Sequence, residues 1–193
     1  MEVAMVTSNP HKVEETRKIA EPFGIELKHV DLDVPEVRGT LQDIVQDKAR
    51  RSFAEAGEPV ICDDSGFFVD ALGRFPGPFS AYVLHTIGCG GILKLMRGEG
   101  ERGAEFRCAA AYHDGKRMLV RMGIARGTVT EEPRGSGGFG YDPIFQPAGH
   151  RKTFAEDPSH KMRISHRREA FTELFAELAQ QAEDEEVEDE DEE

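Results

Sequence analysis

The sequence lacks the features that would place the protein in a membrane, in a secretory route or in an oxidising compartment. No stretch approaches the ~20 consecutive apolar residues that a membrane-spanning helix requires. The first residues run directly into an apolar strand pattern, without the basic start and long apolar stretch of a secretory signal. The three cysteines, Cys62, Cys89 and Cys108, form no C-x-x-C pair, which argues against a disulfide framework or a zinc knuckle. We therefore expect a cytoplasmic protein that binds no membrane.

The chain also lacks a block of basic residues. Its 37 acidic and 24 basic residues give a net charge of -13. Ten acids fall within residues 183–193, and the rest of the chain has 27 acidic against 24 basic residues, so its charge is nearly balanced. Without a basic block to displace counterions from phosphates, nucleic acid is disfavoured as a partner. We expect residues 1–182 to form a single domain and residues 183–193 to form a disordered acidic tail, which is either only solvated or recruits a partner.

The first third of the sequence alternates between strand and helix patterns. Residues 3–7 and 25–32 are typical of strands, and the apolar stripe within residues 40–56 is typical of a helix. Residues 60–62 predict a short buried strand, which we expect to end at Asp63-Asp64-Ser65-Gly66. These alternating elements indicate an α/β fold.

The later part of the sequence contains a hairpin pattern and a last helix. Residues 106–112 and 118–130 flank Asp114-Gly115 and predict two antiparallel strands. Phe171, Leu174, Phe175 and Leu178 follow the i, i+3, i+4, i+7 spacing of one helix face. Because a hairpin follows the alternating elements, we expect a mixed sheet.

Thr7-Ser8-Asn9-Pro10-His11-Lys12 joins the first predicted strand to the first predicted helix. Asn9 is a typical N-cap, and the fixed φ of Pro10 suits a first helical turn. A helix N-terminus carries unpaired N–H groups and a partial positive charge, and Lys12 adds a full charge, which suits a phosphate. The alternative is an ordinary capped helix with a surface lysine.

Asp63-Asp64-Ser65-Gly66 is a second candidate site. Adjacent carboxylates repel each other unless a cation or base neutralises them, and such hard oxygen ligands suit Mg²⁺. Because side chains alternate along extended backbone, only one of the two carboxylates would face a given cleft. Glu36 could supply a second carboxylate from a neighbouring loop. The alternative is a simple turn rich in Asp and Gly.

The loop from Gly135 to Pro143 formally contains G-x-G-x-x-G. That fingerprint requires a helix to open at its end, and Tyr141-Asp142-Pro143 opens none, so we exclude a dinucleotide site. The glycines still permit close approach of the backbone to a flat ligand, on which Phe139 or Tyr141 could stack. The alternative is a flexible linker.

The basic segment before the last helix is a fourth candidate. Ser165 is the expected cap, which places His166 and Arg167 in the first turn. Cations there oppose the helix macrodipole, so the placement makes sense if an anion or a polar ring lies in front of them. The alternative is a surface basic cluster. Five other histidines show no ligand spacing and are interpreted as core or surface residues: His29, His85, His113, His150 and His160.

Taken together and in this order, the segments resemble the non-standard purine nucleoside triphosphate pyrophosphatases, the inosine/xanthosine triphosphatase family. The resemblance covers about residues 3–178, and its most specific segment is Gly138-Phe139-Gly140-Tyr141-Asp142-Pro143-Ile144-Phe145. Other segments follow at the family's spacing: Asp63-Asp64-Ser65-Gly66, Asp70-Ala71-Leu72-Gly73, Pro76-Gly77, Thr153-Phe154-Ala155-Glu156, Lys161 and Ser165-His166-Arg167.

The resemblance implies a fold and an activity. The fold is an elongated α/β structure in which a long mixed sheet carries two lobes that flank a central nucleotide cleft. The activity is Mg²⁺-dependent hydrolysis of ITP, dITP or XTP to the monophosphate and pyrophosphate, which removes these nucleotides from the pool. The family usually forms homodimers. The rivals are a related pyrophosphatase for another base and a non-catalytic nucleotide sensor.

The resemblance also implies roles for single residues. Asp64 matches the proposed general base, Glu36 and Asp64 match the metal-linked carboxylates, and Lys12 and Lys48 match lysines that act on the phosphates. Donors at the 6-oxo edge of the base, from His166, Arg167 or the glycine loop, would reject ATP. The full set of substrate-binding positions is Thr7, Ser8, Asn9, Pro10, His11, Lys12, Lys48, Ser65, Phe139, Gly140, Tyr141, Asp142, Lys161, His166 and Arg167.

Three positions depart from the family pattern. Ser8 stands where the family usually has Gly, Arg74 replaces a usual second Gly, and Tyr82 stands where Arg is common. The charged positions assigned to chemistry are all present.

Overall fold

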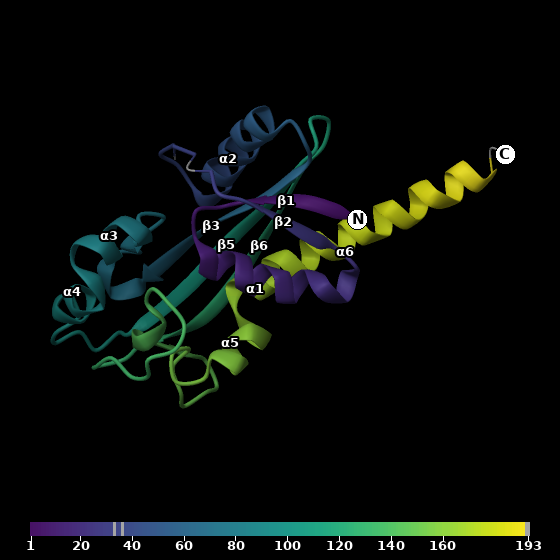
Figure 1. The fold of residues 1–193 in the computed structure, drawn as a ribbon. Coiled ribbons are helices and arrows are strands. Elements are labelled where there is room, and N and C mark those ends of the chain that lie inside the picture. Colours follow the sequence, from purple (N-terminus) through teal and green to yellow (C-terminus); the bar gives the residue numbers. More distant parts are fainter. Residues whose placement is uncertain (33, 36, 192–193) are drawn as a thin grey trace.

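Long strands run through the whole molecule and connect its two ends (Figure 1). The structure is a computed structural model that describes residues 1–32, 34–35 and 37–191. Within these residues, seven strands form one sheet in the order β2-β1-β3-β5-β6-β7, with β4 paired to β3. The strands are β1 (Glu2–Val6), β2 (Glu26–Val30), β3 (Val60–Val69), β4 (Pro76–Gly77), β5 (Gly103–His113), β6 (Met118–Val129) and β7 (Phe145–Pro147).

The sheet is mixed, as the sequence predicts. Strand β1 is parallel to β2 and β3, whereas the pairs β3–β4, β3–β5, β5–β6 and β6–β7 are antiparallel. The helices are α1 (Pro10–Ala20), α2 (Leu41–Ala56), α3 (Ser80–Thr86), α4 (Gly88–Leu95), α5 (Pro158–Ile164) and α6 (His166–Asp191). In the described part of the chain, no helix is long and apolar enough to cross a membrane.

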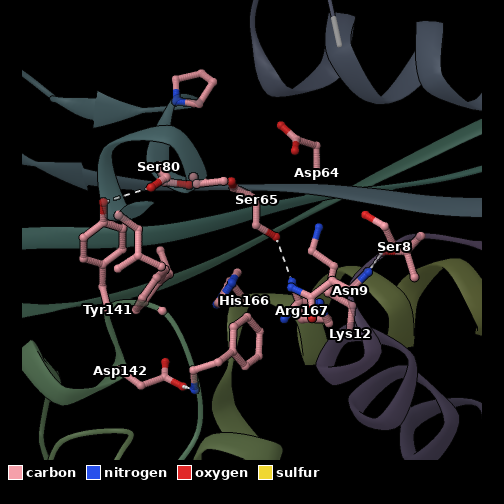
Figure 2. A pocket seen from close by; sticks show the side chains of 18 of the residues that line it. Ser8, Asn9, Lys12, Asp64, Ser65, Ser80, Tyr141, Asp142, His166 and Arg167 are labelled. Atoms are coloured by element: carbon pink, nitrogen blue, oxygen red, sulfur yellow. Dashed lines mark hydrogen bonds between the residues drawn. The ribbon is translucent and has the colours of Figure 1, made fainter. Parts of the chain in front are cut away.

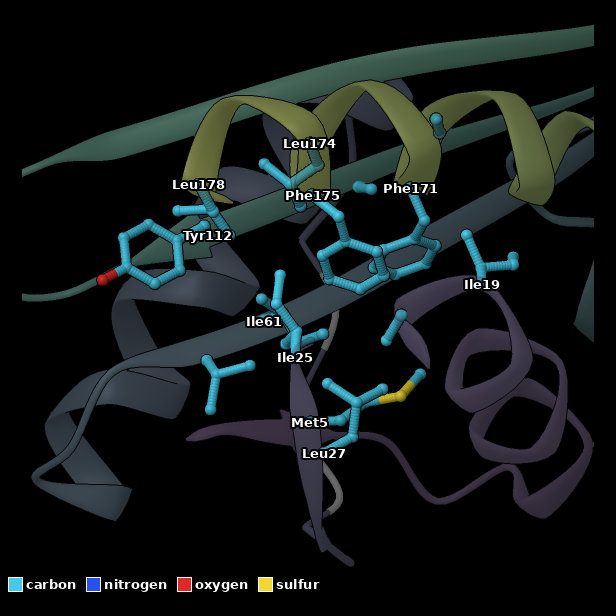
Figure 3. Close-up of a cluster of buried hydrophobic side chains, with 14 of the residues drawn as sticks. Met5, Ile19, Ile25, Leu27, Ile61, Tyr112, Phe171, Leu174, Phe175 and Leu178 are labelled. Carbon is cyan, nitrogen blue, oxygen red and sulfur yellow. The ribbon is translucent and has the colours of Figure 1, made fainter. Parts of the chain in front are cut away.

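Alternation along β5 divides the core between the two faces of the sheet. Cys108, Ala110 and Tyr112 pack with residues of α1 and α6, whereas Ala109 and Ala111 pack with α2. The predicted apolar face of the last helix is confirmed, and Figure 3 shows it above the sheet. The residues drawn there include Phe171, Leu174, Phe175 and Leu178 from α6 and Ile61 from β3.

A second apolar cluster lies toward the other end of the long strands. It combines Phe67 of β3 and Phe106 of β5 with Phe145, Phe154 and residues of α3 and α4. Figure 1 shows α3 and α4 at this end, away from α1 and α6. The long strands thus carry two separately packed regions, as the expected two-lobed fold requires.

Strand β3 differs from the prediction. The sequence predicts a strand that ends at Asp63, but β3 continues through Val69 and pairs with β5 along its full length. Asp63 is fully buried there and lies 3.1 Å from Lys12 Nζ and 3.0 Å from Arg167 Nη2. The turn predicted at Asp63–Gly66 is therefore wrong, because cations from distant segments neutralise a carboxylate inside the strand.

Helix α6 also continues beyond the predicted end of the domain. Its backbone is helical to Asp191, whereas the acidic composition of residues 183–193 predicts disorder. Figure 1 shows this last part projecting away from the sheet. Once a helix has nucleated, each further residue adds a hydrogen bond, and Glu is a good helix former. The division of the chain at residue 182 stays a prediction.

Candidate active site

The register of β1 creates an open edge on β3. Ala4 and Met5 pair with Val60 and Ile61, and β1 ends at Val6, so β3 runs on without this neighbour. Strand β4 pairs with β3 again only at Phe67 and Phe68. The edge of residues 63–66 therefore lies between the two partner strands, and side chains satisfy two of its carbonyls: Lys12 Nζ donates to that of Asp63 at 3.3 Å, and Ser80 Oγ to that of Ser65 at 3.0 Å.

A pocket of about 260 Å³ lies at this edge (Figure 2). Its walls come from the loop after β1, from α1, α2, β3, α3 and β5, from the glycine loop, and from α5 and α6. The lining residues are Thr7, Ser8, Asn9, Lys12, Lys48, Asp64, Ser65, Gly66, Pro78, Ser80, Ala81, Leu84, Phe106, Phe139, Gly140, Tyr141, Asp142, Lys161, His166 and Arg167.

The structure thus brings most of the predicted site residues together in one pocket. Pro10 and His11 are exceptions: both are exposed in the first turn of α1 and do not line it. The His11 ring instead lies parallel to the Phe139 ring, with 5.3 Å between the centroids. Glu36 lies outside the described residues.

Short hydrogen bonds shape the loop that joins β1 to α1. Thr7 Oγ1 accepts a hydrogen bond from the Asn9 amide at 3.1 Å, and Asn9 Oδ1 caps α1 by accepting one from the His11 amide at 3.0 Å. The Thr7 carbonyl accepts a hydrogen bond from His29 Nε2 at 2.9 Å. The predicted N-cap is confirmed, and the loop leads directly to Lys12, whose side chain is largely buried beside Asp63.

Asp63 and Asp64 point to opposite faces of the sheet, as the alternation of a strand predicts. Figure 2 shows Asp64 and Ser65 pointing away from each other, Ser65 toward Arg167. Asp64 lines the pocket and is only 6% exposed, whereas Asp63 is fully buried. Burial raises the pKa of the Asp63 carboxyl, but the charges of Lys12 and Arg167 outweigh it and hold the pKa well below its usual range.

Arg167 and Lys161 lie in a buried network of ions. Arg167 donates to Ser65 Oγ at 3.0 Å and, through Nη1, to Glu15 Oε2 at 2.7 Å. Lys161 Nζ lies 2.8 Å from Glu15 Oε1 and 2.7 Å from Asp142 Oδ2. Burial raises the pKa of Glu15, but both cations act against it and the pKa is lowered overall. Of the two expected neighbours of Arg167, an anion or a polar ring, the protein itself supplies anions, namely Glu15 and Asp63.

Phe139, in the glycine loop, contacts two members of this network and lines the pocket. Its amide donates to Asp142 Oδ2 at 2.8 Å, and Lys161 Nζ lies 4.2 Å from the centroid of its ring. Tyr141 is placed differently, because its ring stacks on Phe67 and its hydroxyl donates to the Ser80 carbonyl at 2.9 Å. Of the two aromatic residues, Phe139 is the one whose ring is not fixed in the core.

His166 is buried in the pocket wall in its neutral form. Its ring stacks on Phe106 at 4.8 Å between centroids. Burial, together with the charges of Arg167 and Lys161, lowers the pKa of His166 well below 6.5. A neutral imidazole has one N–H donor and one acceptor nitrogen, and Nδ1 has no hydrogen-bond partner among the described residues. His166 lines the pocket, so its ring lies within the wall that a bound base would face. The predicted cap is also confirmed, since Ser165 Oγ accepts from the Arg168 amide at 3.1 Å.

The oxygen atoms around Asp64 fit a magnesium ion. The carboxylate lies in the same pocket as the oxygen-bearing side chains of Thr7, Ser8, Asn9 and Ser65. Mg²⁺ prefers such hard ligands, keeps several waters and needs only one or two protein carboxylates. No group of three or more His, Cys, Asp or Glu residues is placed to hold a metal in the described part of the chain.

Two residues link the parts of the site: Glu15, which the sequence analysis misses, and Asp63, which the sequence places in a candidate segment without a role of its own. Glu15 lies three residues after Lys12 on α1, and Asp63 precedes the predicted Asp64. Both bind cations that come from elements far along the chain, so their importance depends on the tertiary fold. Their only signal in the sequence is an acidic residue beside a predicted site residue.

The departures from the family pattern have different surroundings. Arg74 has a φ of 74°, the left-handed region that favours glycine, and it pairs with Asp70 at 2.6 Å and Glu105 at 2.7 Å. Tyr82 is 71% exposed and does not line the pocket, whereas Ser8 does.

Comparisons with known proteins agree with the resemblance. A model of the Ham1 family matches residues 3–177. The dITP/XTP pyrophosphatase of Thermococcus kodakarensis is 48% identical over 176 residues, which cover 90% of this chain and 95% of that protein. The dITP/XTP pyrophosphatase of Methanopyrus kandleri is 48% identical over 180 residues, which cover 92% and 95%.

Solved structures show the same fold. A HAM1 protein from Coxiella burnetii superposes with a TM-score of 0.84 at 30% identity, covering 93% of this chain and 99% of that one. The Ham1 protein of Staphylococcus aureus gives a TM-score of 0.82 at 27% identity, covering 94% and 100%.

Proposed function

We propose that this chain, which belongs to the Ham1 family, hydrolyses the non-standard purine nucleoside triphosphates dITP, ITP and XTP to the monophosphate and pyrophosphate. One observation carries the proposal. A single pocket joins a helix N-terminus with two lysines, a buried carboxylate on β3 and an aromatic ring beside polar groups. These are the parts needed for a triphosphate, for an attacking water and for a base.

Asp64 is the proposed general base. Hydrolysis between the α and β phosphates requires water to attack the α-phosphorus in line with the departing pyrophosphate. A carboxylate hydrogen-bonded to that water accepts its proton, which contributes ~10²–10⁴-fold to the rate. Lys12 and Lys48 bind the phosphate oxygens and offset the charge that develops on the leaving group. Mg²⁺, when bound by Asp64 and Glu36, would supply further neutralisation of the phosphates.

The base end of the pocket supports selection for a 6-oxo purine. At position 6 of the ring, hypoxanthine and xanthine carry an oxygen acceptor, whereas adenine carries an amino donor. A hydrogen-bond donor on the protein is therefore paired when hypoxanthine or xanthine is bound and faces another donor when adenine is bound. Neutral His166 and the amides of the glycine loop are the proposed donors, and Phe139 stacks on the ring. Arg167 supports this edge, since its guanidinium already binds Asp63, Glu15 and Ser65. Facing donors leave buried polar groups unpaired, which costs about 1–3 kcal/mol.

The proposed setting follows the family. We propose that the enzyme works in the cytoplasm as a homodimer, with a nucleotide as its substrate. Sedimentation of the purified chain tests the dimer, which predicts twice the mass of the 193-residue chain.

Metal-dependent release of pyrophosphate tests the activity. We expect turnover of dITP with Mg²⁺, much weaker turnover of dATP and dGTP, and pyrophosphate as the first product. Asp64→Asn should nearly abolish turnover and leave the fold intact. Asp47→Asn is the matched control, because Asp47 pairs with Arg51 one turn along α2 and does not line the pocket. Release of orthophosphate first, or normal turnover by Asp64→Asn, contradicts the proposal. Binding of dITP without hydrolysis favours the nucleotide sensor.

A further inference from the structure

Asp63 contacts both ends of the pocket without lining it. Its Oδ2 atom lies 3.1 Å from Lys12 Nζ, 3.0 Å from Arg167 Nη2 and 3.2 Å from Ser65 Oγ. Lys12 reaches it from the first turn of α1, and Arg167 from the first turn of α6. One fully buried oxygen therefore fixes two helices that come from opposite ends of the chain.

The buried charges around Asp63 form an alternating series. The order of contacts is Lys12, Asp63, Arg167, Glu15, Lys161 and Asp142. The three cations and three carboxylates balance, so each buried charge has a partner of opposite sign. Loss of any one carboxylate leaves one buried cation in excess.

Asp63 and Glu15 hold different parts of this series. Asp63 binds Lys12, which lies in the proposed phosphate segment, and also Arg167. Glu15 binds Arg167 and Lys161, both of which lie within 6 Å of the Phe139 ring. Each carboxylate binds two cations of the network, but within the described part of the chain it is Asp63 that contacts the phosphate end, through Lys12.

We propose that Asp63 is a positioning residue, which holds Lys12 against the phosphates and anchors Arg167 beside the base, so that both ends of the nucleotide site keep a fixed separation. A lysine has a flexible four-carbon stem, and a partner that fixes it before binding reduces the ordering cost of binding. Asp63 also binds Lys12 through its backbone carbonyl, at 3.3 Å from Nζ. The inference rests on the proposed function for the identity of the substrate.

Binding of inorganic tripolyphosphate tests the role of Asp63 separately from catalysis. Titration calorimetry with Mg²⁺ would compare the native chain with Asp63→Asn and Glu15→Gln. Each variant removes one buried carboxylate charge, so each should lower Tm. We expect Asp63→Asn to weaken tripolyphosphate binding by about tenfold or more, whereas Glu15→Gln stays within about threefold of the native affinity. Both variants should weaken binding of IMP.

The outcomes separate positioning from a purely structural role. Native tripolyphosphate affinity in Asp63→Asn, or an equal loss in Glu15→Gln, overturns the inference, as does a native chain that binds no tripolyphosphate. A native chain that binds tripolyphosphate but does not hydrolyse dITP rejects the proposed function alone.

A double variant keeps the test decisive where Asp63→Asn does not fold. Lys12→Met/Asp63→Asn restores the balance of buried charge, because Arg167 and Lys161 keep Glu15 and Asp142. If Asp63 specifically holds Lys12, the double variant recovers most of the Tm that Asp63→Asn loses. Additive losses, or a double variant that also fails to fold, show that Asp63 acts independently of Lys12 and overturn the inference.

Discussion

Gly123 of β6 sets how closely the first turn of α6 approaches the sheet. A Cβ atom at this position would overlap the carbonyl oxygen of His166 and would lie 2.6 Å from the amide nitrogen of Ala170. These are backbone atoms of the helix, so no side-chain rotation relieves the overlap. The Ala170 amide alone would have to move by about 0.8 Å to reach an ordinary contact distance of 3.4 Å. Gly123→Ala should therefore displace the turn that carries His166 and Arg167.

The expected loss has a structural part and a functional part. Overpacking of this kind costs ~1–3 kcal/mol, which corresponds to a Tm lower by about 2–12 °C for a domain of this size. A displacement near 1 Å in a site that positions its substrate costs up to about 100-fold in rate. We expect kcat/KM for dITP to fall by about 10–100-fold in Gly123→Ala at temperatures where the variant is folded.

Gly90 is the matched control. It lies inside α4, its φ is not in the left-handed region, and a Cβ atom there would meet nothing within 4 Å. Gly90→Ala should raise stability by about 0.5–1 kcal/mol and leave kcat/KM unchanged. Thermal melts and dITP kinetics on both variants decide the matter. Native Tm and native kcat/KM in Gly123→Ala would refute the reasoning, because they would show that α6 has room to shift without consequence.

Three further predictions concern stability. In the unfolded chain the imidazole of His166 takes up a proton near pH 6.5, whereas the buried imidazole of the folded chain does not. The free energy of unfolding in urea should therefore fall as pH drops below 6.5, by at most ~1.4 kcal/mol per pH unit, and His166→Asn should flatten this slope. An unchanged slope in the variant would contradict a neutral His166. Thr40→Ala should cost ~0.5–2 kcal/mol in urea unfolding, because Thr40 and Asp43 form a capping box at α2; no loss would show that tertiary packing alone holds this helix start. Burial raises the pKa of Asp114, but hydrogen bonds from the Arg117 amide and side chain outweigh it and lower the pKa to about 2. The contribution of Asp114 to the free energy of unfolding is therefore complete above its ordinary pKa and is lost as pH falls toward 2. An Asp114→Asn variant that loses stability in acid as steeply as the native chain would contradict this role.

Local signals in the sequence predict the segments of the site well. Asn9 and Ser165 cap their helices as expected, since a cap depends only on residues within one turn. Alternation along β3 likewise predicts that Asp63 and Asp64 face opposite sides. The two lobes and the shared pocket come only from the family resemblance, because no local pattern specifies how distant segments meet.

The interior of β3 shows where local signals fail. Asp-Asp-Ser-Gly is a typical turn sequence, and a strand that buries Asp63 is unfavourable on its own. The strand forms because Lys12, 51 residues before, and Arg167, 104 residues after, both reach this carboxylate. Such compensation depends on tertiary contacts across most of the chain, and the same contacts give β3 the open edge at which the pocket lies.

The distribution of charge in the pocket follows from the same contacts. Cations in the first turn of α6 oppose its macrodipole, and the sequence alone favours an anion or a polar ring in front of them. The structure supplies protein carboxylates there: Arg167 and Lys161 are balanced by Glu15 and Asp142, besides Asp63. A hypoxanthine base carries no net charge near neutral pH, and a balanced surface with aligned donors can select it without attracting phosphates. The ion network around Arg167 and Lys161 therefore suits recognition of a base, and Lys12 of α1 and Lys48 of α2 are the residues proposed to bind the triphosphate.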